Sequence, residues 1–300
     1  MEREQLIKMG KSLVEIGFME EGIKKKIYHY IEYKFNEALH FARIAEIHYD
    51  IFREDKCNSN KLKTMVIIEL IILASDIMDD MQDKDAHKEV PWSILNVSDS
   101  YNIIVGILLI CLKEVATLGN KLDIEWIQKN IYQLLLQSVS GQQIDLKNEL
   151  LSESDYLHMS FMKSGSLIAL ACLLGAGDIQ EQTNRKIREY ANYLGVIFQL
   201  RNDVLDIKEG FKKNDIINKK RTLPILYYLN TDEGAYKDIQ DYYLANSSKH
   251  DIMMIHQDII NGEGMLYCST VERFFVDKYE KTINQLKLTD NDKGLLLKII

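Results

Sequence analysis

The chain has 300 residues, a formal net charge of -8, and only two prolines and fifteen glycines. Proline and glycine together reach about half of their average usage, which disfavours a protein built from many short strands and tight turns. Hydrophobic residues at 46% and charged residues at 27% exclude a disordered or collagen-like chain. The negative charge gives no general attraction to nucleic acid, so a phosphate-bearing ligand would need a local basic site or metal ions.

Helical periodicity recurs along the whole chain and predicts an all-α protein. Helices are expected over 3–18, 21–50, 61–83, 101–118, 122–147, 154–175, 182–208, 222–229, 235–245, 250–262 and 268–286. The pattern breaks between residues 83 and 100. Because no linker, repeat or low-complexity block divides the sequence, we expect a single domain over residues 1–300.

The cysteines and the apolar stretches predict where the protein resides. Four cysteines lie far apart, mostly in apolar runs, which is typical of reduced core residues in the cytoplasm. The chain begins with Met-Glu-Arg-Glu-Gln-Leu, which has no apolar signal segment. The longest uncharged apolar stretches, 103–112 and 164–177, are shorter than the ~20 residues that a bilayer span requires. We therefore expect a cytoplasmic protein, with peripheral contact to a membrane left open.

Four carboxylates, which we call the first Asp cluster, share one face of the helix expected over 61–83: Asp76, Asp79, Asp80 and Asp83. Like charges at this spacing destabilise a helix unless something neutralises them. Mg²⁺ binds one or two carboxylates and takes its remaining ligands from water and substrate phosphates. A solvated acidic helix end is the alternative for an isolated cluster. The carboxylates, however, continue directly from the apolar run 66–74, which is unusual for a solvated face.

A second Asp cluster follows the mostly apolar run 193–198 and consists of Asn202, Asp203 and Asp206. Two Asp-rich helix ends about 120 residues apart could clamp a diphosphate through shared metal ions. Lys163 and Lys220 would each be ordinary surface residues if taken singly. Beside the two clusters they become candidate donors to phosphate oxygens, as point charges that stabilise a departing diphosphate.

These residues resemble the motifs of the trans-polyprenyl diphosphate synthase family. Asp79-Asp80-Met-Gln-Asp83 is similar to its first D-D-x-x-D, and 195–206 is similar to G-x-x-F-Q-x-x-D-D-x-x-D, with Asn202 in place of the first Asp. Its other motifs G-Q-x-x-D-L, K-T and G-K-x-T-L-P resemble 141–146, Lys163-Ser164 and 220–224. The resemblance implies one bundle of long helices around a deep apolar pocket, the isoprenoid synthase fold, in a homodimer.

Two departures from that family are equally specific. Ordinary members carry G-G-K-R-x-R-P and R-R-G, which hold the diphosphate of the second substrate, and neither pattern stands in 50–58 or 85–92. Because a bound anion needs compensating charge, recognition of an isopentenyl diphosphate acceptor should be lost while the allylic site is kept. One branch, the ComQ-type isoprenyl transferases of bacilli, resembles this chain in the runs 72–80 and 165–171.

That resemblance implies transfer of a geranyl or farnesyl group from its diphosphate to a tryptophan of a small precursor peptide, the ComX competence pheromone of quorum sensing. It implies two or three Mg²⁺ ions, with candidate ligands Asp76, Asp79, Asp80, Asp83, Asn202, Asp203 and Asp206. The implied diphosphate-binding residues are Lys163, Lys220, Gln199 and Asp203. The implied catalytic residues are Asp79, Asp80, Lys163, Lys220 and Gln142, with Gln142 and Asp145 near the allylic cation.

Several alternatives stay open on the sequence. The first motif can be overlaid on Asp79 and Asp83, which we rank first because the match is literal, or one turn earlier on Asp76 and Asp80. The enzyme could instead be a short-chain prenyl diphosphate synthase or a terpene synthase, and a non-catalytic regulatory subunit ranks lower. Trp92, in the loop around Pro91, is a candidate contact for the peptide.

Overall fold

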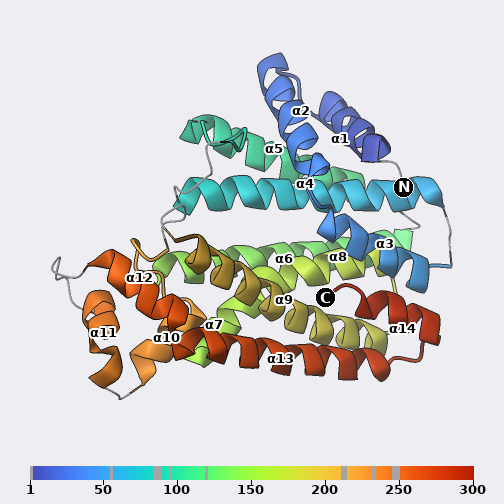
Figure 1. The fold of residues 1–300 in the computed structure, drawn as a ribbon. Helices are drawn as coiled ribbons and strands as arrows, with labels where there is room; N and C mark the ends of the chain where they lie inside the picture. Colours follow the sequence, from blue (N-terminus) through green and yellow to red (C-terminus); the bar gives the residue numbers. More distant parts are fainter. Residues whose placement is uncertain are drawn as a thin grey trace. The chain divides into compact units, whose positions relative to one another are not determined.

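The structure is a computed structural model that describes residues 3–54, 57–83, 89–94, 96–118, 121–210, 215–231, 234–244 and 251–300. These residues form helices joined by turns, with no β-strand among them, which confirms the expected all-α class (Figure 1). The contacts divide the chain into two compact units. Unit one is Met1–Leu136, Leu167–Arg188 and Leu286–Ile299, and unit two is Gln137–Ser166, Glu189–Gln285 and Ile300. The single domain expected from the sequence stays a prediction.

Unit one is built around one long buried helix. It contains α1 (Arg3–Gly17), α2 (Glu21–Asn36), α3 (His40–Phe52), α4 (Asn58–Asp83), α5 (Val97–Val115), most of α8 (Ser166–Ala176) and α14 (Asp290–Leu297). Helix α4 packs against α1, α2, α3 and α5, and every side chain from Thr64 to Ala74 is buried. The apolar run that precedes the first Asp cluster is therefore a core helix, as the sequence predicts.

Unit two carries the other helices. It contains α7 (Glu153–Ser160), a π-helical turn (Phe161–Gly165), α10 (Leu223–Asn230), α11 (Lys237–Leu244), α12 (Ile252–Asn261) and α13 (Glu263–Asn284). Helices α6 (Lys121–Lys147) and α9 (Glu181–Glu209) each contribute residues to both units. The core of unit two around α10 to α12 consists of aliphatic side chains and tyrosines, and Tyr228, Tyr242 and Ile259 are all buried.

The largest differences from the sequence expectation concern α2 and α3, α13 and α14. Residues 21–50 form two helices, because the chain leaves helical conformation after Asn36 and α3 begins at His40 without a side-chain cap at Leu39. Helix α13 begins at Glu263, five residues before the expected start at 268. Helix α14 was not expected, although Thr289 caps it by accepting a hydrogen bond from the Asp292 main chain.

One continuous helical run, Glu153–Ala176, is long and apolar enough to cross a membrane by length and composition. It joins the uncharged stretch 164–177 to a preceding segment that contains the charged residues Glu153, Asp155 and Lys163. It has 24 residues, and 72% of its apolar window is buried inside the protein. A buried run of this kind is also what the core helix of a folded protein shows.

Candidate active site

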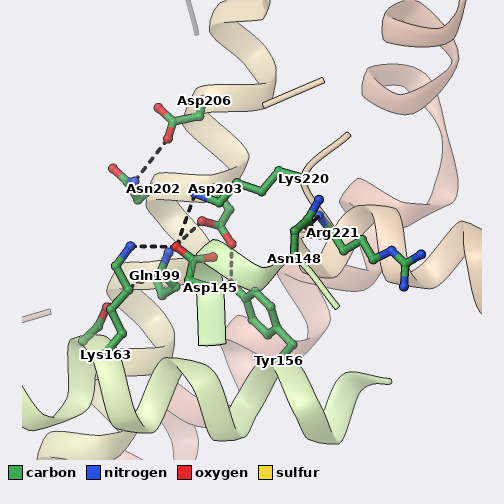
Figure 2. A network of polar contacts seen from close by, with 11 residues as sticks. Asp145, Asn148, Tyr156, Lys163, Gln199, Asn202, Asp203, Asp206, Lys220 and Arg221 are labelled. Carbon is green, nitrogen blue, oxygen red and sulfur yellow. Dashed lines mark hydrogen bonds and ion pairs between the residues drawn. The ribbon is translucent and has the colours of Figure 1, made fainter. Parts of the chain in front are cut away.

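A buried carboxylate that binds two lysines lies at the centre of the site in unit two (Figure 2). The Oδ2 atom of Asp145 accepts a hydrogen bond from Lys163 Nζ at 2.8 Å and forms an ion pair with Lys220 Nζ at 3.3 Å. The Asp145 side chain is 6% exposed, against 15% and 21% for the lysines. Burial alone would raise the pKa of Asp145, but the two lysines outweigh it and hold that pKa below its usual value. The three side chains therefore carry a net positive charge.

The backbone around Lys163 depends on glycines in the neighbouring helices. Lys163 lies in the π-helical turn, a distortion often found at functional sites. A Cβ atom on Gly141 of α6 would lie 2.2 Å from the main-chain nitrogen of Lys163, so only glycine allows α6 to come this close. A Cβ atom on Gly195 of α9 would similarly lie 2.4 Å from Gly165. The glycines of 141–146 and 195–206 thus allow three helical segments to meet at Lys163.

The loop that presents Lys220 is held by Asn148, a residue that the sequence analysis did not single out. Asn148 follows the last residue of α6 with φ of 53°, the left-handed conformation common just after a helix end. Its side chain donates to the Lys219 carbonyl at 2.9 Å and accepts from the Arg221 main-chain N–H at 2.7 Å. The Arg221 guanidinium donates to the Leu150 carbonyl at 3.1 Å. Lys220 is therefore flanked on both sides by bonds to the end of α6.

Asp203 of the second Asp cluster lies in the interior, 3% exposed, with hydrogen bonds to both oxygens. The Tyr156 hydroxyl donates to Oδ2 at 2.7 Å, and the Gln199 amide donates to Oδ1 at 2.8 Å. Ser164 donates to the Gln199 carbonyl oxygen at 2.6 Å and so orients the amide. Burial raises the pKa of Asp203 to about 7, although Lys220 and the Tyr156 bond both act to lower it. Tyr156 and Ser164 extend the site beyond the predicted residues.

The other members of the second cluster are more exposed. Asn202 donates from its amide to Asp206 Oδ2 at 3.2 Å, one helical turn away on α9 (Figure 2). Asp203 points instead towards Tyr156, so the cluster does not present three equivalent oxygens. Gln142 is buried on α6, three residues before Asp145 and therefore on the same side of that helix. Its assignment near the reacting carbon stays a prediction.

The first Asp cluster occupies the last turns of α4 in unit one. Asp76 forms an ion pair with Lys34 of α2, with Nζ and Oδ2 2.6 Å apart. Asp80 accepts a hydrogen bond from the Trp92 indole N–H at 2.7 Å. Asp79 and Asp83 are partly buried on the same helix. Residues 84–88, which include half of the region 85–92 where the family's R-R-G is missing, lie outside the described residues, as do 55 and 56 of the earlier region.

The donors present fit Mg²⁺ bound together with a phosphate ligand. No group of three or more Asp, Glu, His or Cys side chains could hold a metal by itself among the residues whose placement the structure describes. The two clusters nevertheless offer hard carboxylate and amide oxygens. Mg²⁺ seldom occupies a cage made by protein alone and usually completes its six ligands with water and phosphate. Carboxylates without a closed cage are therefore compatible with such an ion.

Comparison with solved structures identifies the class of protein. A geranylgeranyl pyrophosphate synthetase from the archaeon Geoglobus acetivorans has a TM-score of 0.83 at 17% identity, covering 99% of this chain and 96% of that one. A geranylgeranyl pyrophosphate synthase from Corynebacterium glutamicum, complexed with calcium and isoprenyl diphosphate, has a TM-score of 0.76 at 20% identity, covering 99% and 93%. The protein has the all-α isoprenoid synthase fold.

Sequence comparison then identifies the family. A family model described as polyprenyl synthetase matches residues 33–259, so the chain belongs to the polyprenyl synthetase family, and it is a prenyltransferase. Relatives named tryptophan prenyltransferase ComQ align with almost the whole chain. The one from Bacillus subtilis (strain 168) is 29% identical over 291 residues, covering 95% of this chain and 94% of the relative. The one from Bacillus subtilis subsp. natto (strain BEST195) is 27% identical over 289 residues, covering 96% and 89%. The resemblance found in the motifs is confirmed.

Proposed function

We propose that the protein transfers a geranyl or farnesyl group from its diphosphate to a tryptophan side chain of a small precursor peptide, with Mg²⁺ as cofactor. The observation that carries the proposal is the pair of lysines on buried Asp145. In a chain of net charge -8, the two lysines form a local basic site of the kind that a diphosphate requires. Asp145 holds the two ammonium groups together before substrate binds, so the lysine side chains lose little conformational entropy on binding.

The chemistry follows from these groups. Lys163 and Lys220 donate to oxygens of the diphosphate, which favours breaking of the bond between the allylic carbon and oxygen. The electron pair stays with the diphosphate and leaves an allylic cation. Gln142 and Gln199 present amide dipoles in the same set of helices. Mg²⁺ bound by carboxylates of either Asp cluster would supply further positive charge to the leaving group. An indole carbon forms the new bond to the allylic carbon, and a proton of the tryptophan passes to the released diphosphate or another base.

Two observations favour an indole acceptor over isopentenyl diphosphate. Two relatives that align with almost the whole chain are named tryptophan prenyltransferases. The chain also lacks, in 50–58 and 85–92, the arginine patterns that would bind a second diphosphate. A neutral indole needs no such charge, whereas a diphosphate acceptor bound without it would be desolvated at high cost.

The direct test supplies purified protein with Mg²⁺, geranyl or farnesyl diphosphate, and a synthetic precursor peptide, and measures the peptide mass. We expect a mass gain of one prenyl group that is absent when tryptophan in the peptide is replaced by phenylalanine. A parallel reaction offers isopentenyl diphosphate in place of peptide. Chain elongation without peptide modification would contradict the proposal and identify a prenyl diphosphate synthase. A hydrocarbon formed without any acceptor would identify a terpene synthase.

We further propose that the enzyme is a homodimer. Helix α5 exposes an apolar stripe at successive turns, with Tyr101 at 56%, Val105 at 54% and Leu109 at 61% exposure. Tyr132 and Leu136 of α6 are also exposed. An apolar stripe of this kind on a folded protein is typical of a protein interface. Sedimentation analysis should find two chains per particle, and Leu109→Glu should shift the particle to one chain. Leu266→Glu, at a similarly exposed leucine of α13, should not.

A further inference from the structure

Trp92 is buried against the first Asp cluster, and its contacts distinguish it from an ordinary core tryptophan. Its side chain is 7% exposed, although it lies in a turn. The indole N–H donates to Asp80 Oδ2 at 2.7 Å. Buried tryptophan usually finds a partner for this N–H, but here the partner is a carboxylate of a candidate metal site. A peptide contact through this ring, which the sequence suggested, would require it to leave that position.

The ring is held in place by two tyrosines of α2. Tyr30 and Tyr33 both pack edge-on against Trp92, with ring centroids 5.7 Å away in each case and interplanar angles of 76° and 88°. Such edge-to-face pairs each contribute about 0.5–1.5 kcal/mol beyond burial, and they define the plane of the indole. Because the ring plane is defined, the direction of the N–H is defined as well.

The same helix also controls the neighbouring carboxylate. Lys34 follows Tyr33 directly on α2 and pairs with Asp76, one turn before Asp80 on α4. Two of the four carboxylates are therefore restrained by contacts that depend on α2. Asp76 forms an ion pair with a lysine, whereas Asp80 accepts a hydrogen bond from a neutral N–H. A neutral N–H orients a carboxylate without cancelling its charge, so Asp80 keeps its full attraction for a cation.

We propose that Trp92 is a positioning residue for the reaction, which orients Asp80 through its indole N–H and thereby raises the affinity of the first Asp cluster for Mg²⁺. The proposal rests on the proposed function, since it assumes that this cluster binds the metal. A hydrogen-bond donor that contacts a metal-binding carboxylate without binding the metal itself fixes the orientation of that carboxylate. Removing such a donor costs about 10- to 100-fold in metal affinity or activity. Tyr30 and Tyr33 act one step further out, by holding the indole.

The test compares Trp92→Phe, which keeps an aromatic ring but removes the N–H, with the parent protein. We expect the Mg²⁺ concentration for half-maximal release of diphosphate to rise about tenfold. The rate at saturating Mg²⁺ should be largely recovered, which a loss of folded protein would not allow. Trp126→Phe, at the only other tryptophan of the chain, should leave the Mg²⁺ requirement unchanged. An unchanged requirement in Trp92→Phe would overturn the proposal.

A second measurement avoids turnover. In Trp126→Phe, Trp92 is the only tryptophan, so its fluorescence can be followed while Mg²⁺ is added with inorganic diphosphate and without peptide. We expect an emission change that saturates with Mg²⁺ and is strongly reduced in the double variant that also carries Asp80→Asn. Trp92 fluorescence that does not change when Mg²⁺ is added would contradict the proposal.

These outcomes separate the inference from the function. If the parent protein neither modifies a peptide nor releases diphosphate with Mg²⁺, the proposed function fails. If the parent protein does both, and Trp92→Phe has the same Mg²⁺ requirement as the parent, the function stands and the role of Trp92 fails. If Trp92→Phe does not fold, as shown by circular dichroism, the fluorescence measurement on Trp126→Phe decides the question.

Discussion

The two Asp clusters have similar sequences, yet the protein surrounds their carboxylates differently. In unit one, Asp76 receives a lysine and Asp80 an indole N–H. In unit two, Asp203 is buried between a tyrosine hydroxyl and an amide, and the two lysines bind Asp145 instead. Spacing along a helix decides which side chains share a face. The charge and hydration of each carboxylate depend on what packs against that face, so two similar motifs can have different roles.

The largest effect is expected from two substitutions in the first Asp cluster, one for each way of overlaying the family motif. Asp79→Asn should lower the transfer rate about a thousandfold, because a carboxylate that binds the metal contributes several kcal/mol to stabilising the leaving group. Asp76→Asn should reduce the free energy of unfolding, since it leaves Lys34 without its partner, and should affect the rate much less. Steady-state kinetics and thermal unfolding of both variants measure this. The opposite ranking of rates would favour the earlier register.

In unit two, adjacent lysines provide a matched pair of variants. Lys220→Ala should lower the rate about a hundredfold, as loss of one donor to a developing oxyanion typically does. Lys219→Asn is the control, because Lys219 lies over the Tyr242 ring and adopts a positive φ that asparagine tolerates. Its rate should stay close to that of the parent. Equal losses in the two variants would show that the loop, rather than the Lys220 ammonium, is what matters.

A smaller effect is expected from the donor to Asp203. Tyr156→Phe removes the hydroxyl but keeps the buried ring, which leaves one carboxylate oxygen without that donor. The free energy of unfolding should fall by about 1–3 kcal/mol. The variant should also raise the pKa of Asp203 further, since the Tyr156 bond acts to lower it. Denaturant unfolding of Tyr156→Phe, Asp203→Asn and the double variant measures the coupling, and additive losses would exclude a direct interaction.

The smallest effect concerns pH and Glu69, which is 1% exposed on α4 and accepts a hydrogen bond from the Ala42 main chain at 2.7 Å. Burial raises its pKa from 4.5 to about 7. The folded protein therefore holds a proton that the unfolded chain releases, so this group makes stability fall as pH rises from 4.5 to 7. Glu69→Gln should reduce that fall and gain about 1 kcal/mol at pH 8 relative to the parent. The measurement is the free energy of unfolding of both proteins from pH 4.5 to 8. The same pH dependence in the parent and in Glu69→Gln would contradict the expectation.

The sequence was informative wherever a feature is local to one helix. Periodicity located α4, α6 and α9, because a buried helix needs apolar residues at repeated positions on one face. The glycines at 141 and 195 were found through motifs, and the structure gives their reason as close helix contact. The break between α2 and α3 was missed, since the residues between Asn36 and His40 include no glycine or proline and the turn depends on packing.

The sequence by itself determined the all-α class, the family and the residues on each acidic helix face, because these follow from spacing within short segments. Only the tertiary structure decided which partner each side chain meets. Asn148 contacts Arg221 across 73 positions of the chain, and Lys34 reaches Asp76 from another helix. Nor does any local pattern place the Trp92 indole on Asp80. Such pairings depend on how whole helices pack, which short-range periodicity does not encode.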